Sequence, residues 1–245
     1  SFDSATGKMY LLSKYLVEYS DAGTTLPRST KIATSTPFEG GDGGDVEIVN
    51  SYLYATEYNG NRVAVFKGIP TASASASFYI GSPGVDTSAA NKVVNTLQTN
   101  YMITNPQVAT LGGAMAISSD FDRKIYVWKN IPATDGAKPD LVWTTQNQND
   151  SNPLLAMDFQ PDSSAAATAF DGKPLYAAAG EKTFVVWRGI PTKITDVPSL
   201  NIKNSIGNVN FSGSLRVAAD SKYFYILDGD AKRIYVWSGI PTDQN

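Results

Sequence analysis

The sequence of 245 residues contains neither cysteine nor histidine. Without cysteine the chain has no disulfide framework, no thiol nucleophile and no thiolate metal ligand. Without histidine it has no imidazole general base, no Ser-His-Asp triad and no ordinary zinc or copper site. Any catalysis would have to use carboxylate, lysine, tyrosine or serine chemistry, and we predict that the chain is not an enzyme.

The sequence also lacks a surplus of positive charge and a long hydrophobic run. Its net charge is −3, so it has no basic excess to neutralise phosphates, and we expect no nucleic-acid partner. No apolar run reaches the ~18 residues of a membrane helix, so we expect no membrane insertion. The N-terminal residues show no signal peptide. A chain free of cysteine, poor in charge and rich in Ser, Thr, Ala, Asn and Gly is typical of exported microbial proteins, and we predict an extracellular or cell-surface location.

One string of about eleven residues occurs four times: NRVAVFKGIPT, RKIYVWKNIPAT, KTFVVWRGIPT and KRIYVWSGIPT. Its prolines are Pro70, Pro132, Pro191 and Pro241, spaced by 62, 59 and 50 residues. A degenerate fifth copy, YLVEYSDAGTTLP, ends at Pro27. Periods of this length that contain several short strands are typical of β-propeller blades.

Each repeat divides into four short strands bounded by Gly, Asn, Asp or Pro. We therefore predict an all-β chain that forms one β-propeller domain of about five blades, each a four-stranded antiparallel sheet; the alternative is part of a six-bladed propeller. Both terminal blades are expected to be incomplete, and residues 86–101, the only plausible short helix, are expected to form a loop. The approximate blades are residues 1–37, 41–83, 105–147, 152–205 and 210–245.

An aromatic residue stands at one position of every clear repeat: Phe66, Trp128, Trp187 and Trp237. Alternate side chains of a strand face opposite sides, and neighbouring blades cover both faces of a propeller sheet. We expect these rings to be buried between sheets; the alternative is an exposed aromatic ladder for sugars or peptides. At the turn before the Ile-Pro pair, Gly68, Gly189 and Gly239 supply conformational freedom that Asn130, at the equivalent position, can also provide.

The segment IYVWKNIPATDGAKPDLVW, which follows the turn ISSDFDRK, resembles the NHL-type β-propeller repeat of secreted bacterial proteins. The resemblance extends over most of the chain through the repeats and implies a propeller architecture. It implies little about activity, since the best-defined enzymes among NHL-like propellers use a histidine-bound metal, which this sequence cannot supply.

Acidic residues cluster in the segment FEGGDGGDVE, where flexible, oxygen-rich loops suit Ca²⁺. Asp42 and Asp45 are the candidate Ca²⁺ ligands, although Asp and Gly are also ordinary turn residues. No acidic segment fits the twelve-residue EF-hand loop. Apart from this Ca²⁺ site, we expect no cofactor.

The loops between the second and third strands of each repeat differ in charge, which suits recognition of a protein or carbohydrate ligand. We predict a non-enzymatic extracellular binding or scaffold module. Alternatives are a carboxylate-dependent, Ca²⁺-assisted hydrolase or lyase, a lectin, and a surface-layer or filament subunit that self-associates through open blade edges. The candidate binding residues are Asn59, Asn61, Asp120, Asp122, Arg123, Glu181, Lys182, Asp228, Asp230 and Lys232.

Overall fold

The structure, a computed structural model, describes residues 2–3, 6–12, 16–20, 28–33, 43–58, 60–70, 74–81, 103–145 and 159–242. The described residues form strands and turns and contain no helix. Consequently no helix in this part of the chain is long and apolar enough to cross a membrane. The helix candidate 86–101, the Ca²⁺ candidate Asp42 and the binding candidate Asn59 lie outside the described residues.

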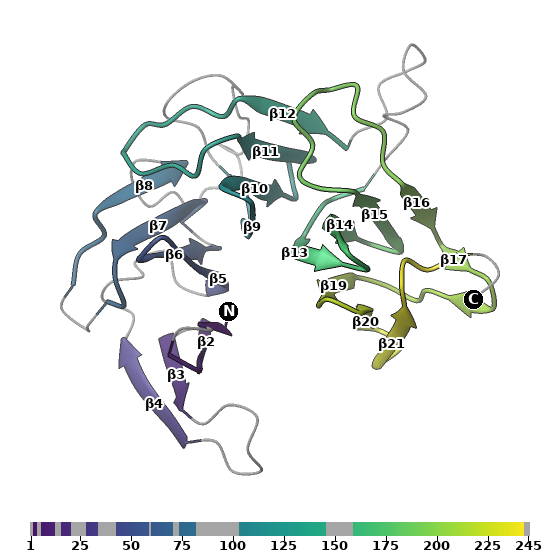
Figure 1. Cartoon of the computed structure of the whole chain (residues 1–245), viewed down its shortest axis with the longest axis horizontal. Helices are drawn as coiled ribbons and strands as arrows, with labels where there is room; N and C mark the ends of the chain where they lie inside the picture. Colours follow the sequence, from purple (N-terminus) through teal and green to yellow (C-terminus); the bar gives the residue numbers. More distant parts are fainter. Residues whose placement is uncertain are drawn as a thin grey trace. The chain divides into compact units, whose positions relative to one another are not determined.

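Five antiparallel sheets follow one another along the chain (Figure 1). We number them sheets 1 to 5; the first four have four strands each in sequential order, and the described part of sheet 5 has three. A small hairpin, β17–β18, lies between sheets 4 and 5 in the sequence. The strands are β1 Phe2–Asp3, β2 Lys8–Leu12, β3 Leu16–Ser20 and β4 Arg28–Ala33 in sheet 1; β5 Gly43–Val49, β6 Tyr52–Glu57, β7 Arg62–Lys67 and β8 Phe78–Gly81 in sheet 2; β9 Gln107–Leu111, β10 Ala114–Ser119, β11 Lys124–Trp128 and β12 Leu141–Thr144 in sheet 3; β13 Ser163–Phe170, β14 Lys173–Gly180, β15 Thr183–Trp187 and β16 Leu200–Lys203 in sheet 4; β17 Ser205–Ile206 and β18 Val209–Asn210 in the hairpin; and β19 Leu215–Ala219, β20 Tyr223–Asp228 and β21 Arg233–Ser238 in sheet 5.

The chain separates into two compact units, Ser1–Val108 with Pro132–Lys138, and Ala109–Ile131 with Pro139–Asn245. The first unit contains sheets 1 and 2, and the second contains most of sheet 3 together with sheets 4 and 5. All five sheets lie within the predicted blade ranges. A single domain for the whole chain stays a prediction.

The repeated string forms the third strand of its sheet in every clear copy. It corresponds to β7, β11, β15 and β21, and the string of the degenerate first copy contains β3. In sheets 2 to 4 the predicted fourth strand pairs with it, as β8, β12 and β16. The expectation of incomplete ends is confirmed, since β1 has two residues and sheet 5 lacks a fourth strand among the described residues.

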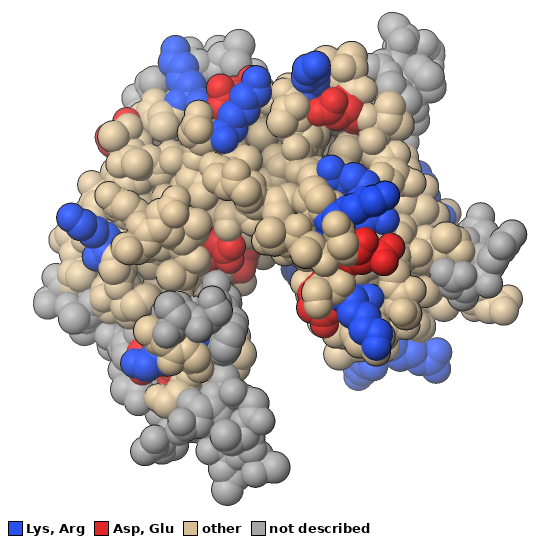
Figure 2. Space-filling model, in the orientation of Figure 1, with Lys and Arg blue, Asp and Glu red and all other residues tan. Residues whose placement is uncertain are grey.

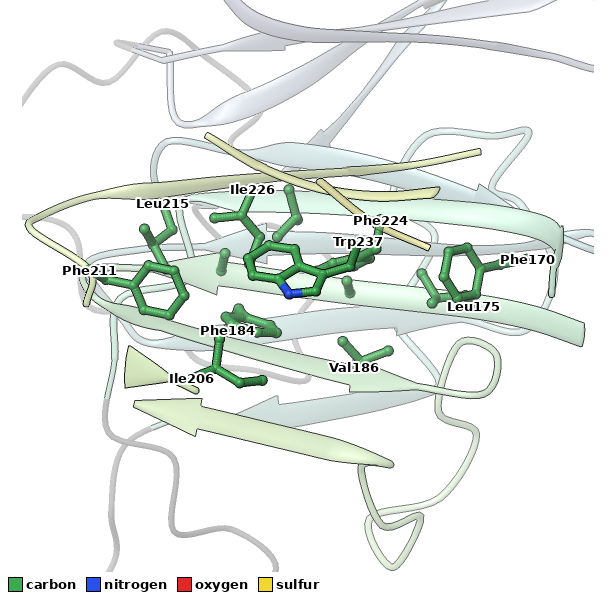
Figure 3. Packing of buried hydrophobic residues seen from close by; sticks show 13 residues of the cluster. Phe170, Leu175, Phe184, Val186, Ile206, Phe211, Leu215, Phe224, Ile226 and Trp237 are labelled. Carbon is green, nitrogen blue, oxygen red and sulfur yellow. The ribbon is translucent and has the colours of Figure 1, made fainter. Parts of the chain in front are cut away.

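The hydrophobic core lies between successive sheets of each unit. One cluster joins sheets 4 and 5, where Phe184, Phe224 and Trp237 pack together (Figure 3). A second joins sheets 3 and 4 around Trp143 and Trp187, and a third joins sheets 1 and 2. Sheet 4 contributes residues to both the first and the second cluster, which is why both faces of β15 are apolar.

The predicted burial of the repeated aromatic residues is confirmed. Phe66, Trp128 and Trp187 are each 2% exposed, and Trp237 is 7% exposed. They are therefore core residues and cannot form an exposed ladder for ligands.

The turn before the Ile-Pro pair follows the prediction except in sheet 3. Gly68, Gly189 and Gly239 have φ of 78°, 107° and 93°, a region that favours glycine. Asn130 does not adopt a positive φ, so it does not use the conformational freedom that the three glycines use. The turn tolerates asparagine because its backbone differs there.

Candidate functional site

Four hairpins join the second and third strands of sheets 2 to 5, and these are the loops predicted to bind a ligand. The last residue of each loop has a left-handed backbone with φ between 50° and 54°: Asn61, Arg123, Lys182 and Lys232. This conformation is uncommon for residues other than glycine. Its recurrence shows that the residue before the third strand has the same backbone conformation in all four sheets.

The aspartates of these loops have different roles. Asp228 is fully buried, and its two carboxylate oxygens accept hydrogen bonds from the Ala231 and Ser212 backbone N–H groups at 3.0 and 2.7 Å. Burial acts to raise the pKa of Asp228, but the backbone donors outweigh it and hold the pKa below its usual value. Asp228 therefore caps the turn, which leaves Asp230 as the exposed acid of this loop.

The hairpin of sheet 3 places its acids at other positions of the same turn. Ser119, which pairs with Lys124, stands where Asp228 stands in sheet 5. Asp122 accepts a hydrogen bond from the Tyr126 hydroxyl at 2.7 Å and lies 3.5 Å from the Lys124 ammonium group. Burial raises the pKa of Asp122 despite these partners. Both loops therefore carry acidic residues, but these residues stand at different positions of the turn in sheet 3 and in sheet 5.

A polar pocket of about 620 Å³ lies at the hairpin end of sheets 3 to 5, within the second unit. Five of its lining residues were predicted binding residues, and they come from three successive hairpins: Asp120, Arg123, Glu181, Lys182 and Asp230. Its other lining residues lie mostly on the segments that enter or leave the sheets: Phe159, Gln160, Asp162, Thr183, Lys203, Asn204, Gly213 and Ser214. The pocket thus brings together four acidic and three basic side chains.

The remaining binding candidates do not line this pocket. Asn61 belongs to the first unit and is 2% exposed. Asp122 and Asp228 are held by the contacts described above, and Lys232 lies on the sheet 5 hairpin outside the lining. Figure 2 shows acidic and basic side chains next to one another in the region of β13, β14 and β19. The surface around the pocket is therefore mixed in charge.

Asp162 connects the pocket wall to the next sheet. One carboxylate oxygen accepts a hydrogen bond from the Ser214 hydroxyl at 2.9 Å, and the other lies 2.7 Å from an Arg216 guanidinium nitrogen. The Arg216 side chain also donates to the Asp162 carbonyl oxygen. Burial raises the pKa of Asp162, and the Arg216 charge and the Ser214 hydroxyl oppose this. This carboxylate is occupied in joining sheet 4 to sheet 5.

Two glycines beside the pocket have neighbours too close for a side chain, a backbone oxygen at Gly180 and the Asp230 side chain at Gly213. A Cβ on Gly180 would lie 2.0 Å from the Gln160 carbonyl oxygen, and a Cβ on Gly213 would lie 1.9 Å from an Asp230 carboxylate oxygen. Only glycine leaves room for these neighbours without a shift of the structure. The two positions therefore fix the shape of the pocket wall.

Of the two candidate Ca²⁺ ligands, Asp45 is the one among the described residues, and its carboxylate holds two strands together. Its oxygens accept the Val46 and Val108 N–H groups at 2.8 and 2.9 Å. Across the described residues, no group of three or more acidic side chains is placed to hold a metal ion. With Asp42 outside them, Ca²⁺ binding stays a prediction.

The stability of the chain should carry a pH dependence from Asp45. Burial, partly opposed by the Val108 N–H group, raises the pKa of Asp45 from 3.8 to about 6. Because the folded-state pKa lies above the usual value, the contribution to stability is complete below pH 3.8 and is lost as the pH rises through about 6. We expect this loss to be about 3 kcal/mol, measured as the difference between wild type and Asp45→Asn in urea unfolding at pH 4 to 7.

Asp220 provides a control of opposite sign for this measurement. Its carboxylate accepts hydrogen bonds from the Tyr225 hydroxyl at 2.6 Å and from two backbone N–H groups, which lower its pKa. Its contribution is present above the usual pKa and is lost as the pH falls. If Asp45→Asn left the pH profile unchanged, the assignment to Asp45 would be wrong.

No protein-family model and no curated protein sequence matches the chain. Among solved structures, it is similar to the RRP9 WD40 repeats (15% identity, TM-score 0.53) and to U3-55K (14% identity, TM-score 0.52), with 98% of this chain and 62% of each other chain covered. It is also similar to a Bacteroides thetaiotaomicron structural genomics protein of unknown function, with 13% identity, a TM-score of 0.55, and 97% of this chain and 57% of that one covered.

These likenesses agree with the sheets described above, and together they define the fold class. WD40 repeats form propeller blades of four antiparallel strands. The chain is an all-β protein with a β-propeller fold of about five blades, and each of the numbered sheets is one blade. It spans about three fifths of the length of the solved structures that it matches.

Proposed function

We propose that the chain is a non-enzymatic binding module whose pocket at the hairpin end of sheets 3 to 5 takes a polar segment of a protein partner. The observation that carries this proposal is the convergence of three hairpins on one pocket lined by acidic and basic side chains. A fold built from repeated sheets can vary such loops without loss of its core. The WD40-type likenesses support a scaffold of this kind at the level of the fold.

The lining favours a peptide segment over a carbohydrate. Sugar sites commonly offer an exposed aromatic ring, but Phe159, the aromatic residue of the lining, is 5% exposed. Exposed Glu181 and Asp230 and the nearby Lys182 can instead pair with a segment that carries charges of both signs. We therefore propose a mixed-charge segment of a protein as the ligand.

The same pocket gives little support to the alternative of a carboxylate-dependent hydrolase. Asp162 is its lining acid with a raised pKa, and that carboxylate is already held by Arg216 and Ser214. The chain has no histidine or cysteine that could act beside it. Location outside the cell and membership of the NHL type remain parts of the proposal, supported by the composition and by the resemblance of the repeat.

Reversal of charge in the pocket should weaken binding selectively. We expect the double variant Lys182→Glu, Lys203→Glu to lose affinity for acidic and mixed-charge peptides by about tenfold, because two charge contacts become repulsive. The probes are fluorescent ten-residue peptides of acidic, basic, mixed and neutral composition, measured by anisotropy at two salt concentrations, and a glycan array.

A matched control reverses charge outside the pocket, with Lys193→Glu and Lys222→Glu. These substitutions should leave the affinity within about twofold, since exposed charges at a distance are screened by salt. Equal loss in both double variants, or binding of glycans in place of peptides, would count against the proposed function.

A further inference from the structure

Most of the charged side chains that line the polar pocket have no partner of their own among the described residues. Asp162 pairs with Arg216, and Asp120 accepts the Phe121 N–H group at 2.6 Å. In the described part of the chain, four other lining side chains form no ion pair and no hydrogen bond: Glu181, Lys182, Lys203 and Asp230. Charges of both signs are therefore available to a ligand in one pocket.

Three of these four charges belong to sheet 4, which has a sheet on each side within the second unit. Phe184 of β15 packs in the cluster shared with sheet 5, and Val185 packs in the cluster shared with sheet 3. Both neighbours of sheet 4 are thus in place, and Glu181, Lys182 and Lys203 stay unpaired beside them.

Backbone hydrogen bonds fix the order of the basic residues across the pocket wall. Lys203 ends β16, and the next residue, Asn204, donates its N–H to the Lys182 carbonyl oxygen at 2.7 Å. The Lys182 N–H donates in turn to the Gly213 carbonyl oxygen at 2.9 Å. The segment with Lys182 therefore lies between the segment with Lys203 and the segment that enters sheet 5.

The acidic residues continue this order toward sheet 5. Glu181 forms an isolated β-bridge with Ser214, and the Gly229 N–H donates to the Ser214 carbonyl oxygen at 3.1 Å. Asp230 comes next in the chain, and its carboxylate lies against Gly213, 1.9 Å from where a Cβ would stand. The two lysines thus stand at one end of a row of four segments and Asp230 at the other, with Glu181 between them.

The length of this row limits which ligands can meet both ends. Hydrogen-bonded neighbouring segments lie about 4.8 Å apart, so the ends are about 10 to 14 Å apart, two steps from Lys182 and three from Lys203 to Asp230. A single amino acid, or an acid and a base next to each other, is too short for this distance. An extended segment rises about 3.3 Å per residue, so charges about four residues apart, on one face of it, match the row.

We propose that the pocket distinguishes the order of charges in its protein ligand. An aspartate or glutamate of the partner binds at Lys182 and Lys203, and a lysine or arginine about four residues away binds at Glu181 and Asp230. This assignment rests on the proposed function, since the same pocket would select one mixed-charge segment over another. A segment with its charges in another arrangement would place like charges together, which lowers its affinity.

Peptides of equal composition test the order of charges directly. The blocked peptide GDDSAKKG has its acidic and basic pairs about four residues apart, and the alternating peptide GDKSADKG has the same residues with the charges mixed. The reversed peptide GKKSADDG is included because the row does not fix the direction of the partner chain. In anisotropy titrations of the full chain with labelled peptides, the better of the two blocked peptides should bind at least about fivefold tighter than the alternating one.

Charge reversal in the protein identifies the residues that meet the basic end of the ligand. Glu181→Lys, Asp230→Lys should weaken binding of the blocked peptide by about tenfold, and replacement of the peptide lysines by aspartates should restore it. Asp135→Lys, Asp171→Lys is the matched control, since both residues are exposed outside the pocket and the net charge changes equally. This control should change the affinity for either peptide by less than about twofold, because distant exposed charges are screened by salt.

The milder variant Glu181→Gln, Asp230→Asn keeps the test valid if a lysine at Asp230 displaces Gly213. It should weaken the blocked peptide by about threefold and leave the alternating peptide unchanged. Equal binding of the blocked and alternating peptides, or equal responses of the pocket and control variants, would overturn this assignment and leave the proposed function standing. If no mixed-charge peptide bound the wild-type chain, both would be wrong.

Discussion

Replacement of Trp187 by alanine is expected to lower the free energy of unfolding by about 4 kcal/mol. Trp187 is 2% exposed, and its ring stacks on Tyr176 at 5.7 Å and meets the edge of Trp143 at 5.6 Å between ring centres. Its indole N–H donates to the Asp196 carbonyl oxygen at 3.2 Å. The substitution would remove a large side chain from the core between sheets 3 and 4 and leave a cavity.

Urea unfolding, followed by far-ultraviolet circular dichroism, measures this loss. The conservative variant Trp187→Phe keeps a ring in place, and we expect it to recover more than half of the loss. Ile234→Ala is the control on an equivalent third strand, since Ile234 is 66% exposed and should change stability by less than about 0.5 kcal/mol. Comparable losses in Trp187→Ala and Ile234→Ala would mean that the core does not lie between the sheets.

The repeated strands could be predicted from the sequence because β7, β11 and β15 are buried along almost their whole length. In β11, Ile125 and Tyr126 face opposite sides of the sheet and both are 0% exposed. Such strands are apolar at every position, and the string that encodes them can recur with little change. The pattern therefore identified the third strand of each sheet and the buried state of its aromatic residue.

The register of the hairpins could not be predicted from the pattern. The sheet 4 hairpin closes at Gly180 and Thr183 and has a two-residue loop, whereas the sheet 5 hairpin closes at Asp228 and Arg233 with four residues between. Within the sheet 5 hairpin, Asp228 belongs to the closing pair and caps the turn, whereas Asp230 lies inside the loop and is exposed. The two acids look alike in the sequence, but their position relative to the closing pair gives them different surroundings.

Eight of the thirteen residues that line the pocket were not singled out by the sequence. Asp162 and Ser214 lie on the connections just before β13 and β19, Lys203 ends β16 where such a connection begins, and none of them belongs to a repeated string. The order of an antiparallel sheet does place these connections at the same end as the hairpin of the second and third strands. From this rule, the sequence analysis could have predicted that these segments lie at the candidate site. The pairing of Asp162 with Arg216 could not be predicted, because it depends on how two sheets pack.

Removal of Arg62 is the other substitution for which we expect a large effect. Glu57 is 0% exposed, the Arg62 side chain is 2% exposed, and the Arg62 Nε donates to the Glu57 carboxylate. The guanidinium carbon also lies 3.8 Å from the centre of the Tyr79 ring. Arg62→Met would leave a buried carboxylate without its counter-charge, and we expect it to lower the free energy of unfolding by about 4 kcal/mol.

The double variant Glu57→Leu, Arg62→Met separates the cost of an unpaired charge from the value of the pair. Because removal of both charges avoids burying either one alone, it should recover most of the loss in urea unfolding. The exposed pair Lys8–Glu18, 2.9 Å apart with the Lys8 side chain 38% exposed, is the control, and Lys8→Met should cost less than about 1 kcal/mol. If the double variant were as unstable as Arg62→Met, the packing of Arg62 on Tyr79, rather than its charge, would explain the loss.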